Sequence, residues 1–561
     1  MDWTWEGASA YQLRDPDDPT DRVWSGEVVQ LDEDRGHIYV SLQAGEVADG
    51  PFRVRPFGFL DALQALFVQC ETLQDRASGV EAALVASLGQ PPSRGWSMLW
   101  GPPGTGKTWT IGRRVAEAEP GERLLVASTT NRATDAVALQ IAAALKERGR
   151  SLDGVRRVGA GADLARFEAR GAEALVARAA AAGRRRLAQL VAVRRRADDP
   201  EERARLTQAI NTTRRAIRDA AGAFLDPDLR VVVCTAFHAL NRTVAPEVTA
   251  LAAAGRAPFT TVVLDEAGLS SRAATAGMAQ LAARHNWLVG DPQQLAPISR
   301  VARVLPSAEA RWLAQSALSH LDPRGQVPAN VELLTVQHRM GPDIRRVVSD
   351  YAYDGRLSDA ETVLDRTFAA DGRLLAEPRA LWYVLDEDTG GRLADIRAER
   401  GPGHRSWVRR RTPAILDELL RAHPSLAQHR TLLMTPFRAQ AQALMRWAGE
   451  RGLLNWEACT VHAQQGAEAP VVLFDPVNAG SHGWGAEEWR RLVNVAASRA
   501  QHQLIVLASR LEMQEPYLRP LADLLAPRVL ERAGSSWTWR AVPGLGNAAV
   551  RAPEAPPTTL G

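Results

Sequence analysis

The chain of 561 residues has only three cysteines and no long hydrophobic run. Cys70, Cys234 and Cys459 lie far apart and match no zinc-ligand spacing, so neither a disulfide framework nor a zinc module is suggested. This pattern favours a reducing, intracellular location, whether cytoplasmic, nucleoid or nuclear. No apolar stretch approaches the roughly 20 residues of a membrane span, and the N-terminal residues lack a secretion signal. We therefore expect a soluble protein with no membrane partner.

Lysine is almost absent: only two of the 68 basic residues are lysines. One of them, Lys107, is the seventh residue of GPPGTGKT, residues 101–108. A lysine is required in such a P-loop because a guanidinium fork would not fit beneath the β- and γ-phosphates. Apolar residues 98–100 precede the loop and a helical pattern follows it to about residue 119, an order that directs backbone N–H groups at phosphates. The predicted phosphate-binding residues are Gly101, Pro103, Gly104, Thr105, Gly106, Lys107 and Thr108.

The arginines are unevenly distributed, although the net charge is only +3. Residues 151–222 hold 16 arginines and no lysine against nine Asp and Glu. The segment is rich in alanine, nearly free of proline and helical in pattern, which predicts an arm of helices. Such an arm either contacts nucleic acid or is a solvated helical hairpin, and the residues favour neither.

The order of apolar segments predicts an α/β fold with more than one core, since 45% of the residues are hydrophobic. Short alternating runs at 23–31 and 37–42 predict a small β-rich module over residues 1–60. Strand-like runs then alternate with helical segments, which is typical of parallel sheets covered by helices. This rhythm restarts near residue 332, so we predict two tandem domains, 61–330 with the helical arm as an insertion and 331–535, followed by a disordered tail, 536–561. The strand-like runs are 98–100, 124–127, 231–234, 262–264 and 287–289, then 381–385, 431–434, 471–474 and 504–507.

Two adjacent carboxylates, Asp265 and Glu266, follow the apolar run 262–264. Ligands gather at the carboxyl edge of such sheets. Asp265 would hold Mg²⁺, directly or through water, together with the Thr108 hydroxyl, while Glu266 would orient and deprotonate an attacking water. An Asp-Glu pair alone is usually a solvated loop entry, but after a buried strand in a chain with a P-loop it predicts a catalytic pair. After the next run, the neutral amide of Gln294 could touch the γ-phosphate.

Three segments in this order, GPPGTGKT at 101–108, DEAG at 265–268 and GDPQQLAP at 290–297, resemble those of superfamily 1 helicases. The similarity is to superfamily 1B, in the branch that contains the nonsense-mediated-decay helicase and senataxin. It extends over residues 98–509. Further segments that resemble motifs of the family are STTN at 128–131, VCT at 233–235, QHRM at 337–340, TPF at 435–437 with Gln440, TVH at 460–462, QGAE at 465–468 and NVAASRA at 494–500.

The resemblance implies two RecA-like domains, with ATP on the first facing the second across a cleft. Arg339 and Arg499 would stabilise charge on the transferring phosphoryl group, although either could instead form an ordinary ion pair. By resemblance, His338 would stack on the base, Glu468 would contact the ribose and Gln465 would couple the nucleotide state to the bound strand.

A single strand of DNA or RNA would cross both domains, held by backbone N–H groups and polar or arginine side chains. The resemblance implies that the β-rich module is a small barrel over this channel. Each candidate strand contact taken alone is more often a capping or turn residue. The candidates are Thr130, Asn131, Thr235, Pro436 and Thr460.

The chain departs from the family at two positions of the expected base site. His338 stands where the relatives carry a tyrosine, and imidazole offers less stacking area. The glutamine that precedes the P-loop in the relatives is not evident, and Gly79 occupies its expected place. We expect weaker nucleotide affinity or a relaxed choice of base. The family's zinc-rich regulatory region also has no counterpart, since three dispersed cysteines cannot supply it.

The leading hypothesis is a monomeric helicase or translocase that uses ATP and Mg²⁺ and moves 5′ to 3′ along a single strand. The alternative is an ATP-gated clamp that closes on nucleic acid with little or no unwinding. The complete catalytic set favours turnover, and a metabolic P-loop kinase would not need the arginines of the second domain. The catalytic set consists of Lys107, Asp265, Glu266, Gln294, Arg339 and Arg499.

Overall fold

The computed structural model describes residues 10–14, 23–32, 37–42, 53–56 and 95–545, the last range with gaps. The chain divides into two compact units that interleave along the sequence, and each is described by itself. The first unit comprises Met1–Met98, Thr108–Leu288 and Leu305–Leu313, and the second comprises Leu99–Lys107, Val289–Val304 and Ala314–Gly561. The gaps are 160–161, 177–185, 188, 195–198, 200–201, 204, 211, 214–222, 244–245, 300–306, 365–378, 386–395, 402–403, 464–467, 479–483 and 535.

The N-terminal part of the first unit contains a four-stranded antiparallel sheet with the order β3-β2-β1-β4. The two strands predicted at 23–31 and 37–42 are confirmed as β2 and β3, which pair with each other up to Asp32 and His37. The four strands are β1 (Ala10–Arg14), β2 (Val23–Asp32), β3 (His37–Leu42) and β4 (Arg53–Pro56).

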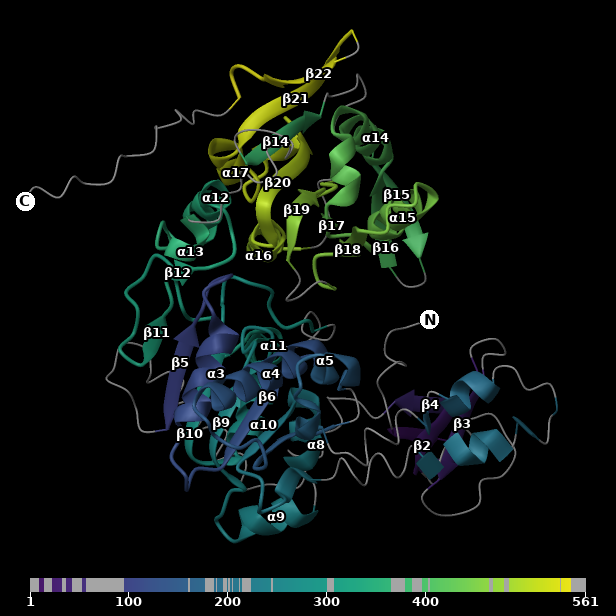
Figure 1. Cartoon of the computed structure of the whole chain (residues 1–561), viewed down its shortest axis with the longest axis vertical. Coiled ribbons are helices and arrows are strands. Elements are labelled where there is room, and N and C mark those ends of the chain that lie inside the picture. Colours follow the sequence, from purple (N-terminus) through teal and green to yellow (C-terminus); the bar gives the residue numbers. More distant parts are fainter. Residues whose placement is uncertain are drawn as a thin grey trace, which may run out of the picture. The chain divides into compact units, whose positions relative to one another are not determined.

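The first large sheet has seven strands in the order β11-β5-β10-β9-β6-β8-β7. Its neighbouring pairs from β10 to β7 are parallel. All five strand-like runs predicted for this region lie inside strands, because apolar residues on both faces of a parallel strand are covered by helices (Figure 1). The strands are β5 (Trp96–Trp100), β6 (Leu124–Ser128), β7 (Val155–Arg157), β8 (Val231–Thr235), β9 (Phe259–Leu264), β10 (Ala282–Gly290) and β11 (Val331–Leu333).

Helix α3 (Lys107–Glu117) follows the P-loop and buries one face, including Ile111 and Val115. It packs closely on α4 (Asn131–Glu147): a Cβ on Gly112 would lie 2.8 Å from the carbonyl oxygen of Gln140, so only glycine fits. The other helices of this region are α5 (Leu164–Glu168), α8 (Ala236–Thr243), α9 (Pro246–Ala253), α10 (Arg272–Ala279) and α11 (Ser307–Ala314), with 3-10 turns η2 (Glu173–Leu175) and η3 (Ala223–Leu225).

The predicted helical arm, residues 151–222, is helical only in part. Helical residues are described at 164–168, 186–187, 189–194, 202–203, 205–210 and 212–213, with a 3-10 turn at 173–175. The prediction is wrong for β7, which forms the edge of the parallel sheet beside β8. Arg157 in this strand is buried and pairs with the buried carboxylate of Asp135 (Nε to Oδ1, 2.8 Å), so it is not a solvated helix charge.

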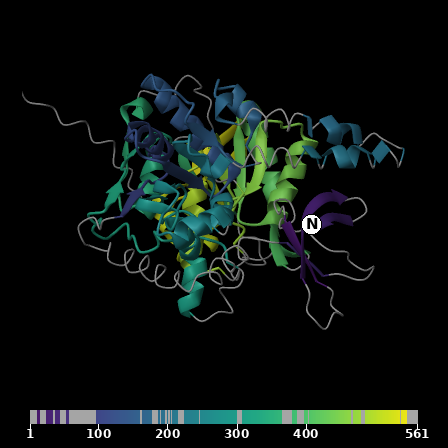
Figure 2. The same cartoon turned by 90° about the horizontal axis from the view of Figure 1, so that it is seen from below.

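The second unit contains a seven-stranded sheet with the order β18-β17-β19-β20-β14-β21-β22, whose light green strands can be seen in Figure 2. All pairs are parallel except the last, β21 with β22. The four strand-like runs predicted for this domain are confirmed. The strands are β14 (Ala380–Leu385), β17 (Thr431–Thr435), β18 (Trp456–Thr460), β19 (Ala469–Phe474), β20 (Ala500–Ser509), β21 (Ala526–Ala533) and β22 (Ser536–Ala541).

Strand β22 corrects the start of the predicted tail, because residues 536–541 complete the sheet. Side chains of Leu381, Leu433, Leu473 and Ile505 form the core on one sheet face, covered by α14 (Thr412–Ala422) and α15 (Arg438–Glu450). The helices and 3-10 turns are α12 (Pro342–Ala352), α13 (Glu361–Leu364), α14 (Thr412–Ala422), α15 (Arg438–Glu450), α16 (Ala486–Ala497), α17 (Arg519–Leu524), η5 (Pro424–Gln428) and η6 (Glu512–Gln514). Two small two-stranded sheets pair β12 (Val336–Gln337) with β13 (Ser358–Asp359) and β15 (Ile396–Gly401) with β16 (His404–Arg409).

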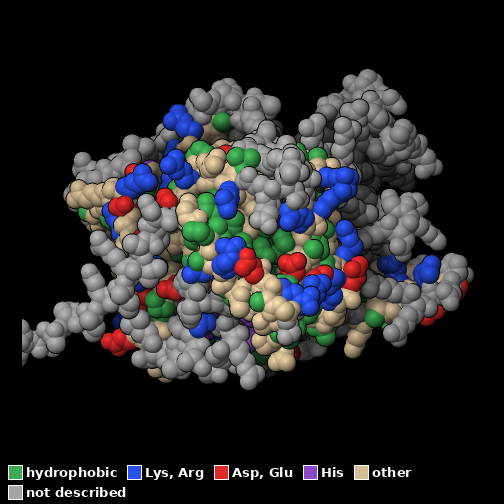
Figure 3. All heavy atoms as spheres, turned by 90° about the horizontal axis from the view of Figure 1, so that it is seen from above, with side chains coloured by type: hydrophobic (Ala, Val, Ile, Leu, Met, Phe, Trp, Pro, Cys, Tyr) green, Lys and Arg blue, Asp and Glu red, His purple; other side chains and the backbone are tan. Residues whose placement is uncertain are grey.

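The surface carries charges of both signs. On the face drawn in Figure 3, basic and acidic side chains are interspersed around hydrophobic ones and do not form a patch of one sign. Among the described helices, none combines the length and the apolar character that a bilayer crossing requires.

His238 in α8 lies three residues after the end of β8 and is half-buried. Burial lowers the pKa of His238 to about 4, and the nearby positive charges of Arg242 and Arg157 act in the same direction. The ring lies edge-on against Phe224, with 5.9 Å between the centroids. The folded chain therefore holds this histidine neutral.

We predict that His238 makes the free energy of unfolding depend on pH. The pKa of His238 in the folded chain is below the ordinary value of 6.5. The contribution of the neutral ring to the free energy of unfolding is therefore complete above pH 6.5 and is lost as the pH falls towards 4. Denaturant unfolding between pH 7 and about pH 4.5 should show a loss of stability about 2 kcal/mol larger in the natural chain than in His238→Gln. Equal losses in the two proteins would contradict the prediction.

Candidate functional site

The P-loop, residues 101–107, belongs to the second unit and is built around the Lys107 side chain. Lys107 Nζ donates to the carbonyl oxygen of Gly101 at 2.5 Å, and a Cβ on Gly101 would lie 2.1 Å from Lys107 Cγ. Gly104 and Gly106 have φ angles of +76° and +84°, in the left-handed region that glycine adopts without strain. The loop sequence therefore specifies its own backbone shape.

The segment QHRM, residues 337–340, lies against the P-loop within the second unit. The backbone N–H of His338 donates to the carbonyl oxygen of Gly104 at 2.9 Å, while the His338 side chain is exposed. A Cβ on Gly104 would lie 2.7 Å from the Cβ of Arg339. Gln337 shapes this segment, since its Oε1 accepts from the backbone N–H groups of Arg339 (2.8 Å) and Met340 (2.7 Å).

Two predicted nucleotide-site residues, Arg339 and Glu468, form an ion pair at this segment. Arg339 Nε is 2.5 Å from Glu468 Oε2, and another Arg339 nitrogen donates to the carbonyl oxygen of Ser498 at 3.2 Å. Ser498 directly precedes Arg499, which is buried. The other oxygen of Glu468 accepts from Gln501 Nε2 at 3.0 Å. The structure thus brings Arg339 and Glu468 together and bonds Arg339 to the residue before Arg499, whereas Gln465 lies in 464–467, outside the described residues.

Gln294 is buried, and its amide is held by a neighbouring carboxylate. Its Nε2 donates to Asp291 Oδ2 at 2.9 Å. Asp291 follows β10 directly, and its Oδ1 accepts from Trp100 Nε1 at 3.1 Å. The position of the Gln294 amide therefore depends on Asp291.

Asp265 and Glu266 lie in the first unit, directly after β9. Asp265 is buried, and its backbone N–H donates to the carbonyl oxygen of Ala127 at 2.8 Å. Glu266 has a φ of +54°, which is uncommon and strained for a residue other than glycine. Thr108 lies in the same unit near the start of α3. A carboxylate and a hydroxyl are hard oxygen donors that suit Mg²⁺, so the chemistry of this pair fits the expected ion.

The candidate strand contacts of the first unit lie at the carboxyl ends of two paired strands. Ser128 at the end of β6 is in register with Thr235 at the end of β8. The hydroxyl oxygen of Thr130 caps α4 by accepting from Ala133 N–H at 3.2 Å, and that of Thr235 accepts from His238 N–H at 3.2 Å. Both threonines are therefore capping residues, whatever else they contact.

Asn131 is exposed, and its side chain is oriented by a buried arginine. Its Oδ1 accepts from a guanidinium nitrogen of Arg157 at 2.9 Å. Arg157 is in turn fixed by its ion pair with Asp135. Sequence reasoning missed this positioning role because Arg157 stood in a segment rich in arginines.

In the second unit, Pro436 and Thr460 also lie at adjacent strand ends. Thr435 at the end of β17 is in register with Thr460 at the end of β18, and Pro436 follows Thr435. The backbone N–H of Val461 donates to the carbonyl oxygen of Thr435 at 3.0 Å. Pro436 is buried and Thr460 is half-buried.

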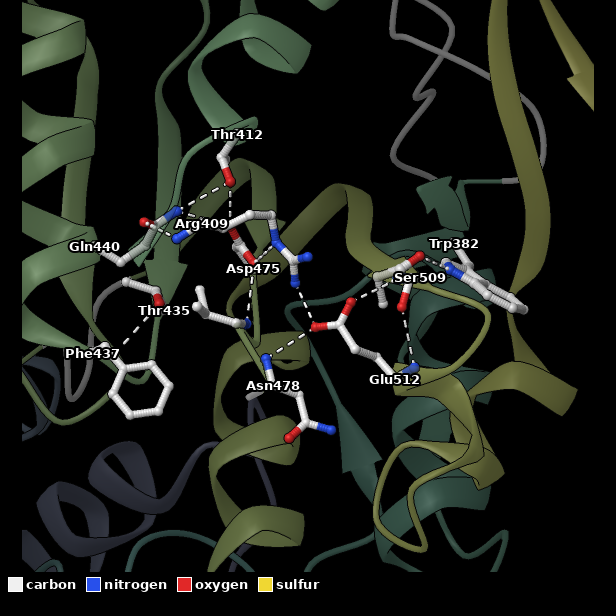
Figure 4. A network of polar contacts seen from close by, with 12 residues as sticks. Trp382, Arg409, Thr412, Thr435, Phe437, Gln440, Asp475, Asn478, Ser509 and Glu512 are labelled. Carbon is white, nitrogen blue, oxygen red and sulfur yellow. Dashed lines mark hydrogen bonds and ion pairs between the residues drawn. The ribbon is translucent and has the colours of Figure 1, made fainter. Parts of the chain in front are cut away.

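A buried polar network lies next to these strand ends (Figure 4). Asp475, directly after β19, accepts from Arg409 Nε at 3.1 Å, from the Thr412 hydroxyl at 2.6 Å and from Gln440 Nε2 at 2.9 Å. The other end of the Arg409 guanidinium donates to Glu512. Gln440 Oε1 accepts from the backbone N–H of Arg409 at 3.0 Å, so the amide of Gln440 is used within the protein.

The charges of this network compensate one another away from solvent. Arg409, Asp475 and Glu512 are each at most 3% exposed. Burial alone would lower the pKa of the Arg409 guanidinium, but the carboxylates of Glu512 and Asp475 raise it above its ordinary value. The planar fork of arginine can reach two carboxylates at once, which a lysine could not do. Arg409, Asp475 and Glu512 were not identified as a network from the sequence. The one sequence feature that could have indicated it is the carboxylate of Asp475 directly after the predicted strand 471–474.

We predict that Arg409→Met destabilises the protein strongly, because it leaves two buried carboxylates without their cation. The expected loss in free energy of unfolding is about 3 to 5 kcal/mol. The matched control is Arg540→Met, which removes a half-exposed ion pair with Glu531 (2.7 Å) and should cost about 1 kcal/mol or less. Denaturant unfolding of both variants measures the difference, and similar losses would refute the assigned role of Arg409.

Comparisons with known proteins cover both halves of the chain. Two family models, each described as an AAA domain, match residues 80–224 and 313–511. The helicase sen1 of Schizosaccharomyces pombe is 30% identical over 263 residues, 45% of this chain and 14% of that protein. The ATP-dependent helicase NAM7 of Saccharomyces cerevisiae is 24% identical over 499 residues, 84% of this chain and 45% of that protein.

A solved structure of arterivirus nonstructural protein 10, a helicase, with DNA is similar at a TM-score of 0.36 and 14% identity over 78% of this chain and 65% of that one. This likeness is too weak to assign any residue. The chain spans less than half the length of either curated relative. The two AAA-domain matches, these relatives and the order of motifs along the chain together identify the family. The chain belongs to the superfamily 1 helicases, in the branch that contains the nonsense-mediated-decay helicase and senataxin.

Proposed function

We propose that this protein is a nucleic-acid-stimulated ATPase that moves along a single strand of DNA or RNA and separates duplexes. The observation that carries the proposal is the arrangement in the second unit, where the P-loop carbonyl of Gly104 is bonded to His338 N–H and the neighbouring Arg339 contacts Glu468 and Ser498. A phosphate-binding loop that contacts an arginine-bearing segment is what phosphoryl transfer between two lobes requires. The helicase names of the relatives support the same activity.

The P-loop would bind the triphosphate through its backbone N–H groups and the Lys107 ammonium. The shape of the loop backbone is set by Gly101, Pro103, Gly104, Thr105 and Gly106. The glycines carry no side chain that would block the approach of a phosphate to the backbone. The Lys107 Nζ that now donates to Gly101 O is a mobile point charge and can turn to a phosphate oxygen.

In the first unit, the Thr108 hydroxyl and the Asp265 carboxylate would hold Mg²⁺. The bound ion would neutralise charge on the phosphate oxygens. Glu266 would accept a proton from the attacking water, and its strained left-handed backbone directs its side chain differently from an extended strand residue. Gln294, fixed by Asp291, would sense the γ-phosphate through an uncharged amide.

Arg339 and Arg499 would stabilise the charge that spreads over the transferring phosphoryl group. The Glu468 carboxylate accepts a hydrogen bond from Arg339 at 2.5 Å and so orients this arginine. For Glu468 to contact the ribose as well, the geometry of this ion pair would have to change. His338, whose side chain is exposed, is free to stack on a base. Gln465 would couple this site to the bound strand.

The strand would be held at the carboxyl edges of the two sheets. Thr130, Asn131 and Thr235 belong to the first unit, and Pro436 and Thr460 to the second. Contacts from threonine and asparagine to phosphate and sugar carry no base specificity, which suits movement along any sequence. We propose 5′ to 3′ movement, by the membership in superfamily 1B.

We predict that ATP hydrolysis requires nucleic acid and depends on Glu266 and Arg499. Hydrolysis would be measured with single-stranded DNA, single-stranded RNA or neither. Arg499→Ala should lower kcat on the order of a thousandfold, because it removes charge stabilisation in the transition state, and Glu266→Gln should also abolish most turnover. The matched controls are Arg446→Ala and Glu147→Gln, which change exposed residues and should retain activity. Equal rates of ATP hydrolysis with and without nucleic acid would refute the proposal of a translocase. Unchanged turnover in both Glu266→Gln and Arg499→Ala would refute the assignment of the catalytic residues.

We predict ATP-dependent strand separation on duplexes with a 5′ single-stranded tail, and none on duplexes with only a 3′ tail. The physical reason is directional movement. A protein that moves 5′ to 3′ along a single strand reaches the duplex when the tail is at the 5′ end and moves away from it when the tail is at the 3′ end. The measurement is release of a labelled strand from the two substrates. ATP-dependent retention of the substrate without release would favour the clamp, and release from the 3′-tailed duplex alone would reverse the direction.

A further inference from the structure

Tyr353 follows α12 in the second unit and is 1% exposed. None of the motifs contains it. Its hydroxyl donates to Asp291 Oδ2 at 2.6 Å and accepts from Asn494 Nδ2 at 2.8 Å. A phenol can donate and accept at the same time, so it links a carboxylate and an amide that could not be joined by an apolar ring.

Asp291 is the centre of this network. Four donors reach its carboxylate: Trp100 Nε1 (3.1 Å) and the Gln293 N–H (3.0 Å) at Oδ1, and Gln294 Nε2 (2.9 Å) and the Tyr353 hydroxyl (2.6 Å) at Oδ2. The two donors at Oδ2 are neighbours on one atom. The Tyr353 hydroxyl and the Gln294 amide are therefore positioned by the same oxygen.

Asn494 connects the network to α16, the helix that precedes Arg499. The two protons of its amide nitrogen go to the Tyr353 hydroxyl (2.8 Å) and to the carbonyl oxygen of Gln293 (2.8 Å). Arg491 of the same helix donates to the carbonyl oxygen of Pro292 at 3.2 Å. Helix α16 is thus bonded to residues 290–297 by two direct hydrogen bonds, and Tyr353 links Asn494 to Asp291 as well.

We propose that Tyr353 is a positioning residue that couples Gln294 to α16, the helix that precedes Arg499. This inference rests on the proposed function and deepens it. A shift of Gln294 reaches Asn494 through Asp291 and the phenol, so the two sides of the nucleotide site move together. Without the hydroxyl, Asp291 loses a donor and an Asn494 N–H is left unpaired in a buried position.

The protonated phenol persists across the working pH range. Burial raises the pKa of Tyr353 well above its ordinary value, and the Asp291 carboxylate raises it further. The hydroxyl therefore remains a donor to Asp291.

The test compares two variants that each remove one buried hydroxyl. Tyr353→Phe breaks the link, whereas Tyr351→Phe removes a hydroxyl on α12 that donates to the carbonyl oxygen of Tyr517 at 2.6 Å, away from residues 290–297. With saturating single strand, we expect kcat for ATP to fall about tenfold in Tyr353→Phe with KM within about twofold, and both constants to stay within about twofold in Tyr351→Phe. Equal kcat in the two variants would overturn the proposal.

A second measurement does not depend on turnover. Hydrogen exchange of residues 290–297 and of α16 should accelerate together in Tyr353→Phe. Tyr351→Phe should leave residues 290–297 unchanged, because the Tyr351 ring lies beside Arg490 of α16 (5.9 Å) and is not bonded to that loop. If the natural chain hydrolyses no ATP, the proposed function fails, and the exchange result alone then decides whether Tyr353 links the two segments. Exchange that is unaltered in Tyr353→Phe, or accelerated in only one segment, would overturn the link.

Discussion

Parallel strand pairing is the constraint on which the candidate site depends. In each large sheet the parallel strands end at one edge, and Asp265, Thr235, Pro436 and Thr460 lie at or directly after those ends. Ser128 and Thr235 are in register at the ends of β6 and β8, and Thr435 and Thr460 at the ends of β17 and β18. Loops at that edge need not pair with a sheet, so their backbone and polar side chains are available for ligands.

Two buried carboxylates organise the loops at these edges in the same way. Asp291 directly follows β10 and Asp475 directly follows β19, and each also accepts from the backbone N–H two residues further on, Gln293 at 3.0 Å and Val477 at 3.1 Å. Each carboxylate also accepts hydrogen bonds from side chains of segments that are distant in the sequence. Burying a carboxylate is costly unless hydrogen bonds replace its water, so such an aspartate holds its partners in one arrangement. This arrangement gives loops the rigidity that a catalytic or binding site needs.

Most of the fold could be predicted because its signals are local. Continuous apolar runs such as 124–127 and 231–234 are what a strand buried on both faces requires, and they became β6 and β8. The helical interpretation of 151–222 failed at β7 because the composition of that segment hides a buried ion pair. Arg157 is indistinguishable in sequence from the other arginines around it, and only its pairing with β8 and its contact with Asp135 show that it belongs to a buried sheet edge.

The sequence by itself determined the chemistry: the P-loop, the carboxylates after a strand and the arginines of the later motifs, since each depends on residue type and near spacing. Local geometry such as the positive φ of Gly104 and Gly106 follows from the same residues. Only the tertiary structure decided which side chains are partners. Tyr353 reaches Asp291 across 62 residues and Asn494 across 141, separations at which a single sequence carries no signal because hydrogen bonding depends on distance in space.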